Sequence, residues 1–135
     1  MTTEAGRERP TLKMIATPGA PTPRGHYSQA VVAAGFVHVA GLLPMLAGSG
    51  ALAGPDPAVQ ADQVLRNLDA ILLAAGTDRT RVVSIQVFVT DGALWPIVNE
   101  ACAAYFAAHR PARIIVPIGP LRDGALLELN AVALA

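Results

Sequence analysis

Two charged residues stand inside apolar stretches near the C-terminal end, and they are the first candidates for chemistry. Arg113 begins the apolar run 114–116, and Glu128 lies within the apolar run 125–135. Burying a charge in an apolar strand costs free energy unless a partner or ligand pairs with that charge. An arginine binds a carboxylate through two parallel hydrogen bonds, and a glutamate in apolar surroundings suits proton transfer because burial disfavours its charged form. The pair predicts a site for a small carboxylate.

Composition narrows the class of protein. The 135 residues suffice for one domain with a sizeable core. Hydrophobic residues make up 53% and charged residues 15%, against about 25% charged in a typical soluble domain. So little polar surface indicates that part of it is buried in an oligomer. Ten basic and ten acidic residues give zero net charge, which argues against binding to nucleic acid or a membrane surface.

The cysteine count and the N-terminal sequence favour a cytoplasmic protein. Cys102 is the single cysteine, so no internal disulfide is expected and a reducing compartment is favoured. Residues 1–13 lack the apolar core of a signal peptide. No apolar run approaches the roughly 20 residues that span a bilayer. No grouping of His, Cys and Asp has metal-ligand spacing, so neither a membrane nor a metal is expected.

Periodicity and turn residues predict the elements that position the pair. An Asp–Pro start and apolar residues at three- and four-residue spacing predict the first helix. Alternation in the fourth strand puts Val83 with Ile85 on an apolar face, and His109 is expected to end the second helix beside its dipole. The expected elements are strands at 12–16, 30–34 and 36–40, a helix at 57–75, a strand at 81–90, a helix at 94–109, and strands at 112–117 and 125–134. The strands at 30–34 and 36–40 are expected to form a β-hairpin around Gly35.

This order of elements predicts an α+β fold in which one mixed β-sheet has two helices packed on one face. Residues 1–12 are expected to form a flexible N-terminal arm, and residues 13–135 a single domain. A sheet covered on one face leaves the other exposed. The apolar composition predicts that other subunits bury that face.

Several short segments together resemble one protein family. They are GHYSQA at 25–30, VAGLLP at 39–44, YF at 105–106, RPAR at 110–113 and LE at 127–128. On these residues the chain resembles the RidA family, also called YjgF or L-PSP, over about residues 13–135. The resemblance implies a chorismate-mutase-like fold, a homotrimer with a central β-barrel, and ligand clefts between subunits. It also implies hydrolysis of reactive 2-imino or enamino acids to 2-keto acids and ammonia, without a cofactor or metal.

The resemblance also assigns roles to residues of this chain. Arg113 would hold the substrate carboxylate, and Glu128 would deprotonate a water molecule or return the proton to the leaving nitrogen; these two are the catalytic candidates. Tyr27 would close the cleft from across the subunit interface. Backbone groups near Gly41 and Ile115 would fix the imine end. The other substrate-binding candidates are Phe88, Asn99 and His26.

Structural roles stay open for the same residues. Arg113 could pair with an acid across the trimer, and Glu128 could pair with Arg113 or with an interface lysine. Asn99 could bond loop backbone, and His26 could be a solvated loop residue. Cys102 on the apolar side of the second helix is expected in the core.

Three positions depart from the family pattern by lacking a polar group: Ala40, Leu42 and Ile115. An apolar cleft favours a bulkier or more apolar substrate than iminopropanoate. It also leaves open a non-catalytic trimer that binds small carboxylates in a regulatory role. Endoribonuclease activity is a further alternative, against which the zero net charge and the absence of a basic stripe argue.

Overall fold

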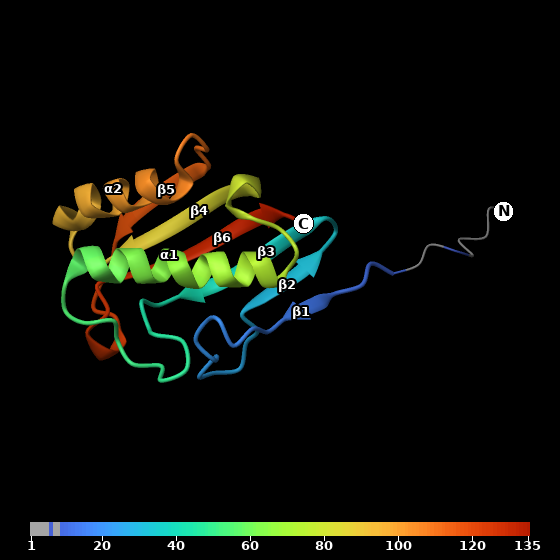
Figure 1. Ribbon diagram of the computed structural model, residues 1–135, viewed down its shortest axis with the longest axis horizontal. Coiled ribbons are helices and arrows are strands. Elements are labelled where there is room, and N and C mark those ends of the chain that lie inside the picture. Colours follow the sequence, from blue (N-terminus) through green and yellow to red (C-terminus); the bar gives the residue numbers. More distant parts are fainter. Residues whose placement is uncertain (1–5, 7–8) are drawn as a thin grey trace.

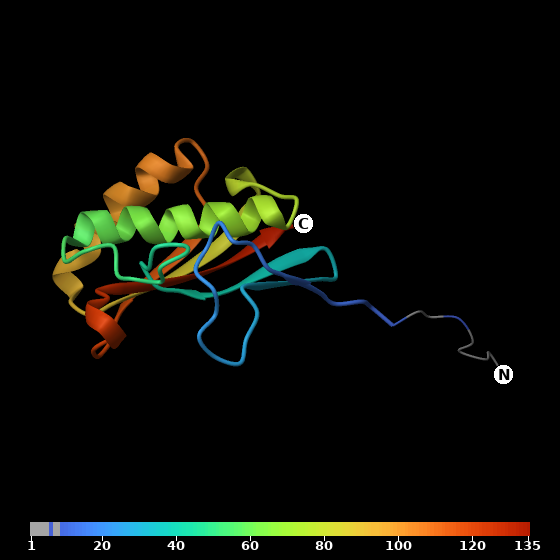
Figure 2. The ribbon, with the colours of Figure 1, turned by 60° about the horizontal axis from the view of Figure 1, so that its bottom comes forward.

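The protein folds into a six-stranded sheet with two α-helices on one face (Figures 1 and 2). The structure is a computed structural model that describes Gly6 and residues 9–135. The expected α+β class and order of elements are confirmed. The elements are β1 (Lys13–Ile15), β2 (Ala30–Ala33), β3 (Phe36–Leu42), α1 (Pro57–Ala74), β4 (Val82–Val89), α2 (Trp95–Phe106), β5 (Ala112–Pro117) and β6 (Leu127–Leu134), with short 3-10 turns η1 (Arg79–Arg81), η2 (Gly92–Leu94) and η3 (Arg122–Gly124).

The expected N-terminal arm falls mostly outside the described residues. Residues 1–5 and 7–8 are not described. Residues 9–12 are exposed and form neither helix nor strand. The arm therefore stays a prediction.

The sheet is mixed, as predicted, with strand order β1-β2-β3-β6-β4-β5. Strands β4 and β5 run parallel, and all other neighbours are antiparallel. The predicted β2–β3 hairpin turns at Ala34 and Gly35, whose φ angles of 50° and 83° fit a two-residue turn. Both α-helices cover the same face, which leaves the opposite face of the sheet open (Figure 2).

Helix α1 begins at Pro57, as predicted, and its buried side chains form the centre of the core. The Asp56 carboxylate accepts a hydrogen bond from the Ala58 amide at 2.9 Å, which satisfies one of the free donors at the helix start. Gly76, with a φ of 83°, follows the helix end. Leu68 and Ile71 are fully buried against the sheet, and burial of each such side chain contributes about 1.5–3 kcal/mol.

The core face of β4 differs from the prediction at its first residues. Val83 was expected in the core but is 44% exposed, whereas Val82 is 2% exposed. The pairing of β4 with β6 shifts register between Val82 and Ser84. An extra residue in one strand reverses the alternation of side chains beyond it. After the shift, Ile85 and Val87 face the core as expected.

Helix α2 ends three residues before the predicted His109. Ala107 has a φ of 54°, which takes the chain out of the helix after Phe106. His109 therefore lies beyond the helix end, and the prediction that its charge interacts with the helix dipole is wrong. Its ring Nε2 lies 2.7 Å from the Val82 carbonyl oxygen. Because a carbonyl only accepts, Nε2 carries the proton and donates it.

The buried polar side chains are all neutral. Within the described residues, no charged side chain is buried. The Gln29 amide accepts from Thr17 N at 2.7 Å and donates to the carbonyls of Thr17 and Pro21, both at 3.0 Å. These bonds fix the long loop between β1 and β2. The buried polar residues are Gln29, Gln60, Asn67 and Thr77.

Gln60 of α1 ties down the segment that leads into β6. Its Nε2 donates to the carbonyls of Gly54 at 2.8 Å and Gly124 at 3.3 Å. Its Oε1 accepts from Leu126 N at 2.8 Å. One buried amide therefore holds the chain at Leu126, directly before β6 and two residues before Glu128.

Candidate active site

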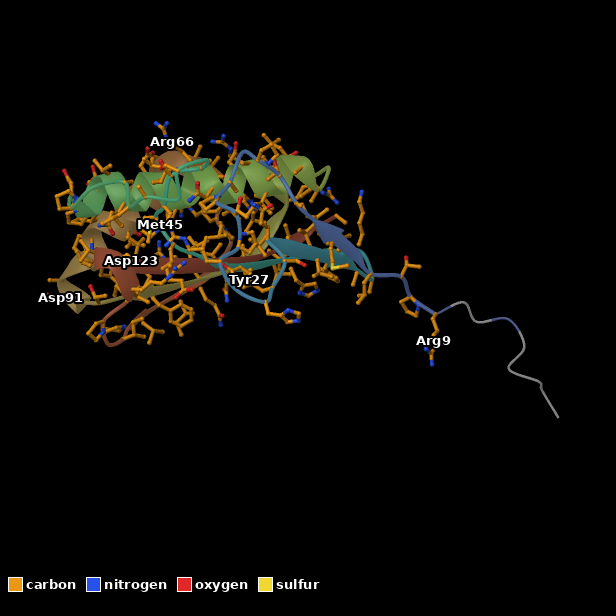
Figure 3. All side chains as sticks on the ribbon, turned by 90° about the horizontal axis from the view of Figure 1, so that it is seen from below. Arg9, Tyr27, Met45, Arg66, Asp91 and Asp123 are labelled. Carbon is orange, nitrogen blue, oxygen red and sulfur yellow. The ribbon has the colours of Figure 1, made fainter. Side chains whose placement is uncertain are left out.

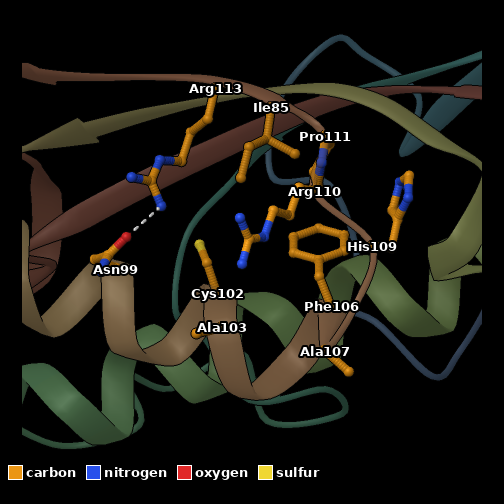
Figure 4. Close-up of a pocket in the computed structure, with 10 residues that line it drawn as sticks. All are labelled: Ile85, Asn99, Cys102, Ala103, Phe106, Ala107, His109, Arg110, Pro111 and Arg113. Carbon is orange, nitrogen blue, oxygen red and sulfur yellow. Dashed lines mark hydrogen bonds between the residues drawn. The ribbon is translucent and has the colours of Figure 1, made fainter.

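Arg113 lies on the edge strand β5, with its side chain on the helix-covered face. It pairs in register with Ile85, which is buried in the core, and paired neighbours share a face. Its Nη1 donates to Asn99 Oδ1 at 3.1 Å (Figure 4). Its guanidinium carbon lies 5.4 Å from the ring centroid of Trp95. Trp95 and Asn99 stand four residues apart on one side of α2, so α2 orients the arginine.

No carboxylate neutralises Arg113 among residues 9–135, because none of the salt bridges there includes it. Beside it is a pocket of about 510 Å³, lined among others by Cys102 and Phe106 (Figure 4). Burial raises the pKa of the Cys102 thiol above its usual value, and Arg113 offsets only part of that rise. The thiol is therefore protonated at neutral pH and serves as pocket wall, in agreement with its expected place in the core.

Glu128 lies on β6 beside a second pocket, of about 520 Å³, which Tyr27 and Gly41 also line. Its side chain is half-buried, and it forms no ion pair within the described part of the chain. A Cβ added at Gly41 would lie 2.5 Å from Glu128 Oε1. The missing side chain at Gly41 is therefore what lets the carboxylate lie against the β3 backbone.

The Tyr27 loop, between β1 and β2, extends beyond the sheet on the side away from the helices (Figure 2). Figure 3 shows Tyr27 on the opposite side of the sheet from Arg66, which lies on α1. Tyr27 is 50% exposed. The neighbouring His26 is also exposed, but it is absent from the lining of the Glu128 pocket.

Arg113 and Glu128 lie on opposite faces of the sheet within one chain. Arg113 pairs with Ile85, and Glu128 pairs with Phe88. Ile85 and Phe88 are an odd number of residues apart on β4, so their side chains point to opposite faces. One chain therefore carries two half-sites. Arg113, Asn99 and Ile115 belong to the helix-covered side, and Tyr27, Gly41, Phe88 and Glu128 belong to the open side.

A cluster around Tyr105 holds α2 against α1 and thereby supports the Arg113 half-site. The Tyr105 hydroxyl donates to Asp69 Oδ1 at 2.8 Å. Arg79 lies over the Tyr105 ring, 4.4 Å from its centroid, and its Nη2 is 3.4 Å from the Asp69 carboxylate. Burial, followed by the hydrogen bond to Asp69, raises the pKa of Tyr105 far above its usual value. The hydroxyl therefore keeps its proton and its bond.

Replacing Tyr105 with phenylalanine is expected to lower the free energy of unfolding by about 1–2 kcal/mol, because Asp69 loses a hydrogen-bond donor. Urea denaturation measures the change. Tyr27→Phe is the matched control, since the Tyr27 side chain is half exposed and should shift stability by less than about 0.5 kcal/mol. Equal destabilisation in the two variants would contradict the role of the Tyr105 cluster.

Comparison with known proteins identifies the fold family. Residues 17–135 match the family described as Endoribonuclease L-PSP. The chain belongs to the RidA/YjgF (L-PSP) family. Over 121 residues it is 39% identical to a rat (Rattus norvegicus) protein named 2-iminobutanoate/2-iminopropanoate deaminase, an alignment that covers 90% of this chain and 88% of the rat protein.

Two solved structures share the fold. The Rid-family protein YyfA from Yersinia pestis matches with a TM-score of 0.90 at 36% identity, covering 93% of this chain and 100% of that chain. E. coli TdcF with bound serine matches with a TM-score of 0.86 at 31% identity, covering 91% and 98%. Among the described helices of this RidA-family chain, none has the length and apolarity needed to cross a membrane.

The three apolar departures from the RidA pattern do not all reach a pocket. Ala40 lines the Glu128 pocket. Leu42 is 8% exposed, belongs to the core and lines a smaller pocket that Tyr27 also borders. Ile115 is half-buried and packs against the core. Of the three, only Ala40 lines the Glu128 pocket.

Two residues of this RidA site are absent from the candidates that the sequence suggested. Trp95 is 47% exposed and lies under the Arg113 guanidinium. Its four-residue spacing from Asn99 was the available signal. Arg110 entered only as part of the RPAR segment, yet it lines the Arg113 pocket. In the described chain, no three His, Cys, Asp or Glu side chains gather closely enough to hold a metal ion.

Proposed function

We propose that this protein hydrolyses 2-imino and enamino acids to 2-keto acids and ammonia. The observation that carries the proposal is Arg113, which Asn99 and Trp95 orient beside a pocket and which has no carboxylate partner in residues 9–135. Such a guanidinium suits a substrate carboxylate. The 39% identity to the rat deaminase supports the reaction. The serine bound to TdcF supports a ligand of amino-acid size.

We further propose that the active sites lie between the subunits of a homotrimer. The opposite-face arrangement supports this, since two copies are needed for an Arg113 half-site to meet a Glu128 half-site. The open sheet face carries Ile114, Phe36 and Leu134, which are 52%, 38% and 39% exposed. Such a face is normally covered by another surface. Three copies would pack these faces into a central β-barrel, with Tyr27 facing the next copy's Arg113.

In this cleft Arg113 binds the substrate carboxylate, while backbone groups near Gly41 and Ile115 fix the imine end. Glu128 takes a proton from a water molecule as the water oxygen bonds to the imine carbon. Glu128 returns this proton to the nitrogen, which gives the carbinolamine. The carbinolamine hydroxyl then gives up its proton, the leaving nitrogen gains one, and the C–N bond breaks, so that ammonia leaves as the keto group forms. An enamine first gains a proton at carbon and loses one at nitrogen, which makes it the imine.

We propose that the cleft prefers side chains longer than that of iminopropanoate. Ala40 in one half-site supports this preference, as do Cys102 and Phe106 in the other. The imine derived from leucine should then show a higher kcat/KM than the imine derived from alanine. A higher kcat/KM for the imine derived from alanine would contradict the proposed preference for longer side chains.

The reaction is tested with 2-imino acids that an amino acid oxidase generates in situ, trapped by semicarbazide. The protein should reduce semicarbazone formation as its concentration rises, because it hydrolyses the imine before trapping. Unchanged trapping for every imine would refute the proposed reaction. The single cysteine supports a cytoplasmic location, which stays a prediction.

Mixing two inactive variants tests whether the site is shared. Arg113→Ala retains an intact Glu128 half-site, and Glu128→Gln retains an intact Arg113 half-site. After unfolding and joint refolding at equal amounts, random assembly should make about one quarter of the clefts complete. Activity near that fraction is expected. Each variant refolded alone is the control, and a mixture as inactive as its components would contradict a site shared between copies.

A non-catalytic carboxylate-binding trimer is the second candidate, favoured by the loss of a polar group at Ala40. It predicts that 2-keto acids raise the melting temperature while no imine is hydrolysed. Turnover of any imine decides against it. Endoribonuclease activity, which the family description names, would instead show as cleavage of RNA, and the zero net charge argues against that outcome.

A further inference from the structure

A second guanidinium, that of Arg110, enters the pocket beside Arg113 (Figure 4). Among the described residues, none of the salt bridges involves Arg110. No Asp or Glu lines the pocket. Two positive charges therefore face one pocket without a negative counter-charge, which is an arrangement suited to a ligand with two anionic groups.

The backbone on both sides of Arg110 is held in place. The His109 ring donates to the Val82 carbonyl at 2.7 Å, and His109 N donates to the Phe106 carbonyl at 3.0 Å. Pro111 follows directly and restricts the backbone of Arg110 to extended conformations. Because its base is fixed, Arg110 loses less conformational freedom when its guanidinium binds a ligand.

The wall of the pocket between the two arginines and α2 is mainly apolar. Cys102 and Phe106 contribute side chains from α2, and Ile85 contributes one from β4 (Figure 4). Burial keeps the Cys102 thiol protonated by raising its pKa, so it adds no charge. A substrate held by Arg113 alone would leave this wall and Arg110 without contacts.

We propose that this pocket receives the substrate side chain and that Arg110 binds a second carboxylate at its end. The preferred substrates are then 2-imino acids that derive from dicarboxylic amino acids, with methylene groups against Phe106 and Cys102. This inference rests on the proposed imine hydrolysis and deepens it by naming the second anionic group.

Two imines with side chains of the same carbon length test the inference, one generated from glutamate and the other from norvaline. The wild-type protein should show the higher kcat/KM for the glutamate product. In Arg110→Gln, the ratio of the two kcat/KM values should fall roughly 10- to 100-fold, the usual effect of losing a hydrogen bond to a charged group. Arg66→Gln is the matched control, because Arg66 is an exposed arginine on α1, and its ratio should equal the wild-type ratio.

Calorimetric titration with 2-oxoglutarate and 2-oxopentanoate adds a readout that needs no turnover. Arg110→Gln should weaken binding of 2-oxoglutarate selectively. If neither imine is hydrolysed by the wild type, the proposed reaction fails, whereas the titration still decides the role of Arg110. An equal loss for both ligands would overturn the inference. So would a lower oligomer mass of the variant by light scattering, since Arg110 would then be an interface residue.

Discussion

Replacing Arg113 with alanine is expected to lower kcat/KM for 2-imino acids by roughly 10²- to 10³-fold, the combined effect of losing two charge-assisted hydrogen bonds. The carboxylate would then lack its only proposed anchor in the cleft, and the imine carbon would no longer be held near the water that Glu128 activates. Loss of positioning lowers the rate of the bound substrate as well as its affinity. Both kcat and KM should therefore change.

Arg113→Lys separates charge from geometry at this position. Lysine keeps the positive charge but lacks the planar fork that bonds Asn99 and a carboxylate at once. Its kcat/KM should fall at least about 10-fold, between wild type and Arg113→Ala. Arg66→Ala on the exposed side of α1 is the control. If the kcat/KM of Arg113→Ala stayed within a few-fold of wild type, the proposed role of Arg113 in binding the substrate would be wrong.

Replacing Gly41 with alanine is expected to lower kcat by roughly 10- to 100-fold, less than most of the roughly 10²- to 10⁴-fold that general acid–base catalysis contributes, because the Glu128 carboxylate is displaced and not removed. The new methyl group would lie 2.5 Å from Glu128 Oε1, far inside contact distance, so the carboxylate must move away. The φ angle of Gly41 is not positive, so alanine fits the backbone there. The variant should therefore fold and bind substrate while turning it over slowly.

Gly119→Ala is the matched control for Gly41→Ala. A Cβ at Gly119 has no atom within 4 Å, and the φ angle of Gly119 is not positive either. Stopped assays at saturating substrate compare the two variants. A Gly41→Ala variant as fast as the control would show that the position of the Glu128 carboxylate does not limit the reaction.

The elements were predictable from sequence where local chemistry decides them. The Asp56–Pro57 helix start and the turn at Gly35 depend on neighbouring residues, and both are found as predicted. The end of α2 was not predictable, because Ala107 adopts a positive φ that alanine rarely takes. The register shift in β4 was also hidden, since it exists only in the pairing with β6.

The candidate site was predictable in its residue types but not in its layout. Arg113 and Glu128 stand out locally as charges in apolar runs. Their faces, however, depend on how β5 and β6 flank β4, and these pairings join segments far apart in the chain. Arg110 was hidden for a related reason. Only the early end of α2 and the anchoring of His109 direct it into the pocket.

The buried neutral side chains of the loops have a consequence for how the protein responds to acid. Gln29 and Gln60 hold the loop before β2 and the segment before β6 through amide groups, and amides do not titrate. Acid unfolding usually follows from protonation of buried or paired carboxylates. No charged side chain is buried in the described chain, and the paired carboxylates, such as Asp69 beside Arg79, belong to other contacts. The amide contacts that hold these two segments should therefore be insensitive to acidification.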